Sequence, residues 1–440
     1  MTGEPSNDPD AAGPPAAGPP AAGLGPRAGI LIAAAFLTAS ALGFVLLGVL
    51  ARWLTQEQNA QFLAIWGLVF GIGGALSAVE QEIVRLATTA HLEGRRTSGR
   101  ALQVTGLAIV VALAAVVAIT LLPGVGEVLR ASLLVCALVF LATGGFAVLC
   151  LSRAVLLGSA QVVPYVVVVV GEALLRLVLA AVFFLGGVTP GLGLATLVIV
   201  IGCFGWVPVI KQVAARIDWR GGRSSSRSVA STVGALGLAN GLQTLQVTAF
   251  PAVASAVLGT SAAMASVFGG VTMARLPLVA LAPVQAMAVP IATRLIRTGR
   301  HAELLRLVGV LSAAGAAAAA LAWLGGWLLG PWALRVYMGE AYVIAPAVIA
   351  TLLAASCILA VALLEVAALI ALENYWAAVL VWAVAGAGLL AALVLVPGAL
   401  DVRAAAGVAT GALIAWAVAS AAVATAARRR PSAAEVTPAG

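Results

Sequence analysis

Charged side chains lie inside several of the most apolar stretches of this 440-residue chain. Glu172, Arg176, Arg275 and Glu365 each fall within a run long enough to cross a lipid bilayer. A charge at that depth is costly, so these groups are expected to face a protein-lined or water-lined interior and to mark a pathway. There, guanidinium groups could bind an anion, and carboxylates could carry a proton or another cation.

The spacing of these residues separates a paired set from an unpaired arginine. Glu172 and Arg176 are four residues apart on one helix face, so they can form an intrahelical ion pair. That pair either serves the pathway or only ties helices together. Arg275 has no local partner, so it requires a carboxylate from another helix, a hydrated cavity or an anionic ligand. Glu365 is its best candidate partner within a span.

The segment around Arg275 is unusual for a membrane helix. Residues 271–306 carry Pro277, Pro283 and Pro290 within an apolar run that ends in several arginines. Each proline frees a backbone carbonyl, which is tolerated only against protein or a water-filled cavity. The segment is therefore predicted to line a pathway. The alternative is a kinked packing helix whose arginine reaches the interface or a neighbour.

A stripe of amides opens the second half of the chain. Asn240, Gln243 and Gln246 are spaced three apart and are followed by Pro251. Amides on one side of a membrane helix can hydrogen-bond a sugar, and they also join helices to one another. The sequence favours neither function over the other.

Composition defines the class of protein. With 62% hydrophobic and 9% charged residues, and a mean hydropathy of +1.12, the chain is predicted to be an all-α, multi-pass membrane protein. Its +8 charge comes from short clusters between apolar runs, which argues against a nucleic-acid partner. The sequence has no phosphate-binding loop, metal-ligand cluster or CxxC pair. We therefore expect no enzyme activity, no metal and no cofactor.

Twelve apolar spans must position these groups. They are predicted at residues 29–50, 61–84, 102–122, 131–151, 162–185, 191–211, 229–257, 262–291, 305–329, 342–371, 376–397 and 405–427. The polar stretch between the sixth and seventh has linker composition. The predicted domains are a disordered cytosolic tail (1–27), an N-terminal six-helix bundle (28–211), a cytosolic linker (212–228), a C-terminal six-helix bundle (229–427) and a basic cytosolic tail (428–440).

Basic residues predict the orientation. If the N-terminus is cytosolic, eighteen arginines and lysines, Arg153 among them, fall on the inner side and four on the outer side. Both termini are then cytosolic. The single lysine beside 23 arginines, with abundant alanine, glycine and proline, is typical of a GC-rich coding bias and indicates a bacterial source, so we predict a bacterial plasma membrane as the location. In each half the second span runs into a basic inner loop with a histidine, at residues 80–96 and 289–306, which predicts a parallel repeat.

Three motifs carry a resemblance to a known superfamily. The first motif, the outer turn between the first and second spans, contains Ala51, Arg52, Trp53, Leu54, Glu57 and Phe62. The second, from the seventh to the eighth span, contains Leu258, Gly259, Phe268, Arg275, Pro277 and Pro290. The third, residues 330–345, reads GPWALRVYMGEAYVIA. Together with the six-plus-six division, they resemble the polysaccharide-export branch of the multidrug/oligosaccharidyl-lipid/polysaccharide (MOP) flippase superfamily.

This resemblance implies two bundles around a central cavity that opens alternately to either side. It implies a lipid-linked oligosaccharide on a polyprenyl pyrophosphate as substrate, membrane lipids as surroundings, and glycosyltransferases or a polymerase as pathway partners. The roles it implies are pyrophosphate binding by Arg275, Arg176 and Arg85, sugar binding by Gln243, Gln246 and Asn240, and ion coupling by Glu172 and Glu365. A drug/cation antiporter of the same superfamily, a facilitator-type transporter of another twelve-span fold, and a non-transporting scaffold for envelope synthesis are the alternatives.

Overall fold

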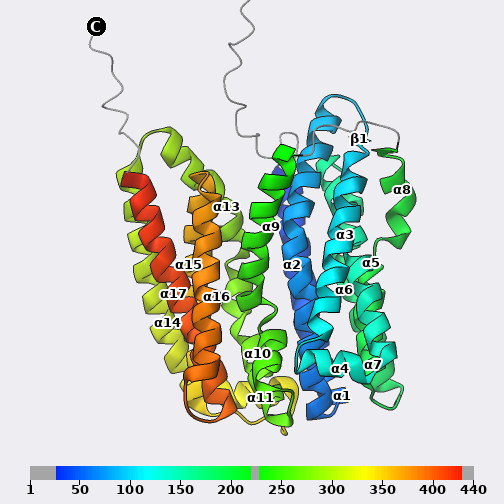
Figure 1. The fold of residues 1–440 in the computed structure, drawn as a ribbon, viewed down its shortest axis with the longest axis vertical. Helices are drawn as coiled ribbons and strands as arrows, with labels where there is room; N and C mark the ends of the chain where they lie inside the picture. Colours follow the sequence, from blue (N-terminus) through cyan, green and yellow to red (C-terminus); the bar gives the residue numbers. More distant parts are fainter. Residues whose placement is uncertain (1–25, 220–226, 429–440) are drawn as a thin grey trace, which may run out of the picture.

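The computed structural model describes residues 26–219 and 227–428, which form two helical bundles (Figure 1). The N-terminal bundle contains α1 (Pro26–Trp53), α2 (Gln56–Leu92), α3 (Arg100–Thr120), α4 (Val125–Ala131), α5 (Leu133–Gly158), α6 (Val162–Leu185), α7 (Leu192–Cys203), the 3-10 turn η1 (Val207–Val209) and α8 (Ile210–Ala214). The C-terminal bundle contains α9 (Arg227–Val247), α10 (Phe250–Leu258), α11 (Ala262–Ala274), α12 (Leu276–Ala280), α13 (Ala282–Arg297), α14 (His301–Met338), α15 (Pro346–Ala371), α16 (Tyr375–Leu395) and α17 (Leu400–Arg428).

The helices reproduce the predicted span pattern. In the described ranges, 11 helices are long and apolar enough to cross a membrane, and the bent pair α9–α10 brings the number to 12. The predicted fold class, an all-α membrane protein of about twelve spans, is confirmed. The sequence did not predict the short helix α4, nor the two-residue parallel bridge between β1 (Thr97–Ser98) and β2 (Ile217–Asp218).

Two spans of the C-terminal bundle are broken where prolines follow. The α9–α10 pair bends by 67° just before Pro251. The eighth span is divided into α11, α12 and α13 at Arg275 and Leu281, and Pro277 is the second residue of α12. Proline lacks the N–H that would continue a helix, so these breaks follow directly from the sequence. They leave polar backbone groups and Arg275 near the boundary between the bundles.

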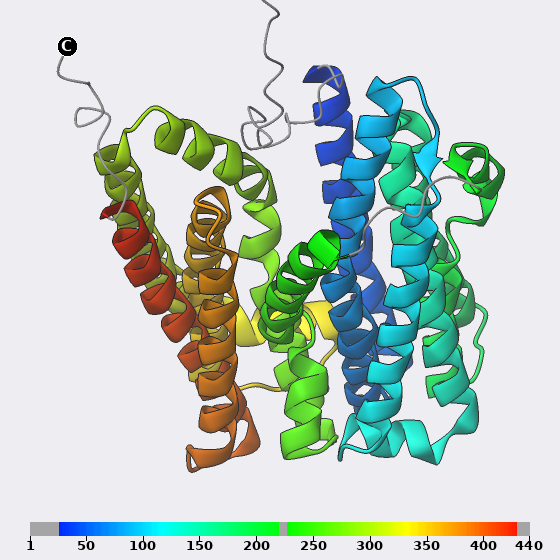
Figure 2. The same ribbon diagram turned by 45° about the horizontal axis from the view of Figure 1, so that its top comes forward.

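Hydrophobic packing joins the bundles at one end. One core cluster runs from the N-terminal bundle into the neighbouring ends of α10, α11, α14 and α15, and includes Leu50, Phe250 and Leu334. A second cluster, which includes Leu369 and Trp382, lies within the C-terminal bundle. Figures 1 and 2 show the two bundles converging at the end drawn lowest in Figure 1. Toward the opposite end α14, α15 and α17 lie away from the N-terminal bundle, while α9 stays beside α2.

Four side chains add hydrogen bonds at the joined end, and we call this set the clasp. Each donates to a backbone carbonyl of the other bundle, across the boundary between α1–α2 and the end of α14. The donors and acceptors are Tyr337 Oη to Phe44 O (2.7 Å), Tyr342 Oη to Ala51 O (2.9 Å), Arg52 Nη2 to Val336 O, and Gln56 Nε2 to Ala341 O. The clasp lies at the predicted outer end, so the bundles are held together there.

The structure shifts several predicted boundaries. The linker predicted at 212–228 is shorter, because α8 and β2 extend to residue 218 and α9 begins at Arg227. The predicted tails fall largely on residues 1–25 and 429–440, which lie outside the described residues. Arg153, assigned to an inner loop, lies within α5. Hydropathy places span ends poorly, because long helices continue past the hydrocarbon layer.

The close contact at Gly202 predicts that the N-terminal bundle cannot accommodate a larger side chain there. A Cβ at Gly202 on α7 would lie 1.8 Å from Nε of Arg176, whereas a Cβ at Gly171 on α6 would meet nothing within 4 Å. We expect Gly202→Ala to lower the free energy of unfolding by about 1–3 kcal/mol through overpacking. Gly171→Ala is the matched control. Thermal unfolding of the two purified variants measures the difference, and equal midpoints would contradict this packing.

Candidate functional site

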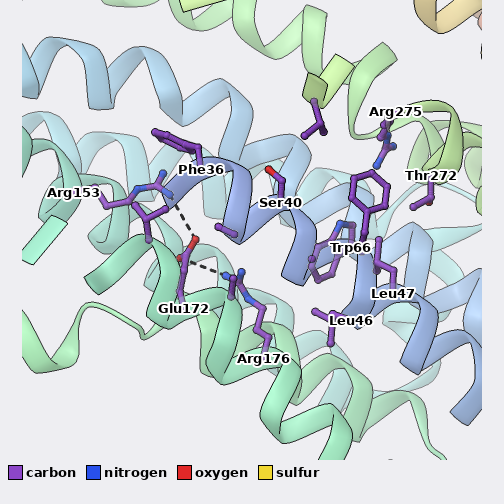
Figure 3. A pocket seen from close by; sticks show the side chains of 16 residues that line it. Phe36, Ser40, Leu46, Leu47, Trp66, Arg153, Glu172, Arg176, Thr272 and Arg275 are labelled. Atoms are coloured by element: carbon purple, nitrogen blue, oxygen red, sulfur yellow. Dashed lines mark ion pairs between the residues drawn. The ribbon is translucent and has the colours of Figure 1, made fainter. Parts of the chain in front are cut away.

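A cavity of about 280 Å³ lies between the two bundles. Helices α1, α2, α5 and α6 form its N-terminal wall, and α11 and α12 form its C-terminal wall. Its charged lining consists of Arg153, Glu172, Arg176 and Arg275, with Ser40 and Thr272 nearby (Figure 3). Both bundles therefore contribute charged groups to one shared space, as expected for a site whose shape depends on how the bundles sit together.

The N-terminal wall holds a chain of four alternating charges. Nη2 of Arg153 on α5 donates to Oε2 of Glu80 on α2 at 2.8 Å, and its Nη1 lies 3.7 Å from Oε1 of Glu172 on α6. Oε2 of Glu172 lies 3.5 Å from Nη2 of Arg176, the pair predicted from their spacing (Figure 3). All four side chains are buried or half-buried. Mutual pairing lowers the cost of holding them there.

Glycines and aromatic rings fix this chain of charges in place. Gly202 on α7 and Gly205 just after it have no Cβ to obstruct α6, so the stems of Arg176 and Glu172 pack directly against these two glycines. The guanidinium of Arg176 lies 5.2 Å from the centre of the Phe70 ring, a cation–π contact. Close packing on both sides leaves Arg176 little freedom to turn away from the cavity.

Arg275 forms the opposite wall at the break between α11 and α12. Its Nη2 donates to the carbonyl of Thr248 at 3.2 Å, in the bend between α9 and α10. The two proline-associated breaks therefore meet at this side chain. No carboxylate is paired with Arg275 among the described residues. The prediction that Glu365 pairs with Arg275 is wrong.

Hydrogen-bond donors outnumber acceptors in this cavity. Its described lining contains three guanidinium groups and one carboxylate, and a guanidinium carries five N–H donors and no acceptor. Five buried side-chain atoms of these residues have no hydrogen-bond partner in the described chain: Arg153 Nε, Arg176 Nε, Arg176 Nη2, Arg275 Nε and Glu172 Oε2. Two of the five, Arg176 Nη2 and Glu172 Oε2, are the atoms of the 3.5 Å ion pair, and the other three are guanidinium N–H donors, so the site lacks acceptor oxygens.

The other residues predicted to bind an anion or a sugar lie outside the cavity lining. Arg85 is exposed on α2, paired with Glu82 at 2.7 Å, and is not part of the cavity lining. Nδ2 of Asn240 donates to Oγ of Ser77 at 2.9 Å, so this amide joins α9 to α2. Gln243 is half-buried on α9 away from the lining. Gln246 is buried and borders a small void that it shares with Arg275.

Glu365 occupies a separate site inside the C-terminal bundle. Its carboxylate accepts hydrogen bonds from Oγ of Ser312 at 3.0 Å and from Oγ of Ser420 at 2.8 and 2.9 Å. Nε1 of Trp416 in turn donates to Ser312 at 3.1 Å. The side chain is 1% exposed, and no described cation pairs with it. It is a buried carboxylate held by hydroxyl groups alone.

Sequence reasoning missed Arg153 and Glu80. Arg153 was assigned to an inner loop, because hydropathy does not show that α5 continues past it, and Glu80, inside the predicted span 61–84, was not singled out. One signal was present: each is an ionisable residue next to an apolar run, and such residues often pair between neighbouring helices.

Comparison with known proteins places the fold. No family model and no curated protein matches this chain. The Vibrio cholerae MATE transporter VcmN in its bent form superposes with a TM-score of 0.55 at 16% identity, covering 91% of this chain and 97% of that one. A multidrug-resistance MATE family transporter of the MOP superfamily matches in its inward-facing conformation (TM-score 0.57, 14% identity, 89% and 96% covered) and its outward-facing conformation (0.56, 14%, 92% and 97%). This chain is thus a multi-pass membrane protein with the fold of the MATE transporters.

Proposed function

We propose that this protein transports an amphiphile with an anionic phosphate headgroup across the plasma membrane, by alternating access between the two bundles. Its predicted class of substrate is a lipid-linked glycan precursor on a polyprenyl pyrophosphate. The observation that carries the proposal is the excess of guanidinium groups over carboxylates in the shared cavity. Phosphate oxygens only accept hydrogen bonds, and guanidinium groups bind them through paired, charge-assisted contacts.

A drug/cation antiporter is the second candidate. The neighbours described as a multidrug resistance MATE family transporter support it through their fold, which this chain shares. The cavity itself supports it less. An organic cation would meet Arg153, Arg176 and Arg275, while the one carboxylate of the lining, Glu172, already lies between two arginines. Like charges at short range disfavour such a ligand unless it is separately neutralised.

The shape of the site fits a headgroup whose lipid tail remains in the bilayer. The cavity volume of about 280 Å³ lies near the lower limit for ligand pockets, so it accommodates a headgroup rather than a whole lipid. A second space of about 600 Å³ lies between α1 and α14 and shares Phe44 with the cavity. Its wall is mainly apolar, with Val45, Val49 and Trp332. In this proposal the tail occupies this second space and Ser40 contacts sugar hydroxyls.

Glu365 is our candidate for ion coupling. A buried carboxylate with hydroxyl donors and no paired cation can take up and release a proton or a small cation. Glu172 is less suited to that role, because Arg153 and Arg176 already balance its charge. Ion coupling would then depend on the C-terminal bundle, whereas headgroup binding would depend on both bundles. Glycan-synthesis enzymes as partners, and a scaffolding role for the protein, stay predictions from the sequence.

The first prediction from this proposed function concerns headgroup binding. Replacing Arg176 or Arg275 by Gln should weaken binding of a short-chain polyprenyl pyrophosphate about tenfold or more, because each change removes charge-assisted donors from the cavity. Arg85→Gln is the matched control, since Arg85 is exposed and outside the lining. Native mass spectrometry of the purified variants measures the change. Unaltered affinity in both cavity variants would remove the pyrophosphate-binding role.

The second prediction concerns the clasp. Tyr337→Phe combined with Tyr342→Phe removes two hydrogen bonds between the bundles, each worth about 1 kcal/mol. We expect the bundles to separate more often at the clasped end. A cysteine replacing Ser40 in the cavity wall should then react faster with a membrane-impermeant reagent applied from that end. Tyr375→Phe, far from the clasp at the start of α16, is the control. Unchanged labelling in the double variant would mean that the clasp does not hold the closed end.

The third prediction separates coupling from binding. Glu365→Gln should leave pyrophosphate affinity within about twofold of wild type, because the carboxylate does not line the cavity, while uptake into proteoliposomes loses its dependence on an imposed ion gradient. Glu303→Gln, on the exposed start of α14, is the control. Gradient-driven transport that survives Glu365→Gln would exclude this carboxylate from coupling.

A further inference from the structure

A second polar cavity lies at the predicted cytosolic end of the N-terminal bundle, apart from the central cavity. It has a volume of about 190 Å³ and is built from three stretches of chain. These are the end of α2 with β1, the turn between α5 and α6, and the residues that follow α8. Figure 1 shows β1 next to α8 at the edge of the bundle that faces away from the C-terminal bundle.

The lining of this cavity is basic and rich in hydrogen-bonding groups. It contains His91, Arg95, Arg96, Arg216, Ser159 and Gln161. No carboxylate contributes to the wall in the part of the chain that the structure describes. We call these residues the basic pocket.

The fold brings the basic pocket together from distant parts of the sequence. β1 pairs with β2 in parallel, and the backbone N–H of Thr97 donates to the carbonyl of Arg216 at 2.8 Å. This bridge places Arg216 beside Arg95 and Arg96. On the other side, the backbone of Ala160 has a φ of 56°, a conformation that non-glycine residues rarely adopt, in the turn that presents Ser159 and Gln161. Strained turns of this kind gather at ligand sites.

Not every basic side chain of the basic pocket is paired with a group of the described protein. Arg95 pairs with Glu93, and Nη1 of Arg216 donates to the carbonyl of Gln212 at 3.0 Å. Arg96 is exposed and has no described side-chain partner. The positive-inside rule requires only that basic residues lie on the cytosolic side. It gives no reason for Arg216 to converge on one cavity with His91, Arg95 and Arg96, which lie in a distant stretch of the sequence.

Apolar side chains are exposed on the chain segments next to the basic pocket. Leu92 at the end of α2, Val207 in η1 and Trp219 after β2 are exposed. Exposed apolar groups and tryptophan at the end of a membrane span lie at the lipid interface. Acyl chains can therefore pack beside a headgroup that enters the pocket, an arrangement that free phosphate does not need.

We propose that the basic pocket binds the phosphate of an anionic glycerophospholipid of the cytoplasmic leaflet. Arg96 and Arg216 bind the phosphate oxygens, and Gln161 hydrogen-bonds the rest of the headgroup. Basic pockets at the cytosolic ends of membrane helices bind anionic lipids in this manner. The bound lipid holds the stretch after α8, from which the chain crosses to the C-terminal bundle. The proposal is independent of what the central cavity transports.

The test compares lipid binding by the full-length protein in detergent, using native mass spectrometry. Wild type should bind phosphatidylglycerol at least about tenfold more tightly than phosphatidylcholine, and Arg96→Ala with Arg216→Ala should lose about tenfold of that affinity. The matched control is Arg294→Ala with Arg297→Ala, which removes the same charge from the exposed end of α13. This control should bind phosphatidylglycerol as wild type does.

Three results would overturn the assignment. Wild type could fail to prefer phosphatidylglycerol, the control variant could lose as much affinity as the pocket variant, or inorganic phosphate at an equal concentration could displace the lipid. If the double variant does not fold, Arg96→Glu replaces it, because Arg96 is exposed and its exchange leaves packing intact. The reversed charge must then lower phosphatidylglycerol affinity, and unchanged binding would equally overturn the proposal.

Discussion

Three guanidinium groups share one cavity between two helical bundles, and only part of their charge is balanced by protein carboxylates. Burying such groups within a membrane is costly, so the surrounding structure must compensate for them. Glu80 and Glu172 pair with the arginines of the N-terminal wall, and a carbonyl at a helix break accepts one hydrogen bond from Arg275. The positive charge that remains is the basis on which we propose an anionic ligand for the cavity.

The two walls of the cavity hold their buried arginines in different ways. On the N-terminal side, continuous helices carry the charges, and glycines on α7 allow the close approach that holds Arg176. On the C-terminal side, prolines break the seventh and eighth spans so that backbone and side chain meet at Arg275. In the proposed mechanism, a rigid wall facing a broken one would allow the bundles to rearrange around a bound headgroup. The clasp and the shared apolar core close the far end in this conformation.

The sequence was sufficient for features that depend on local spacing or hydropathy. The number of spans, the Glu172–Arg176 pair and the proline breaks were all predicted, because each depends on residues close together in the chain. Contacts between distant helices were not predicted. Glu365 was expected beside Arg275, yet two serines from α14 and α17 bind it. Neither serine has a spacing that reveals its partner, so this site emerges only from the three-dimensional packing.

The claim that the cavity carries an anionic headgroup is tested most directly by transport itself. Purified protein in proteoliposomes would be given either a fluorescent short-chain polyprenyl pyrophosphate in one leaflet or a fluorescent organic cation on one side. The account predicts that the pyrophosphate lipid reaches the opposite leaflet faster than in protein-free vesicles and that the cation does not cross faster. Transport of the cation with no acceleration of the pyrophosphate lipid would contradict it and would identify the protein as a drug antiporter.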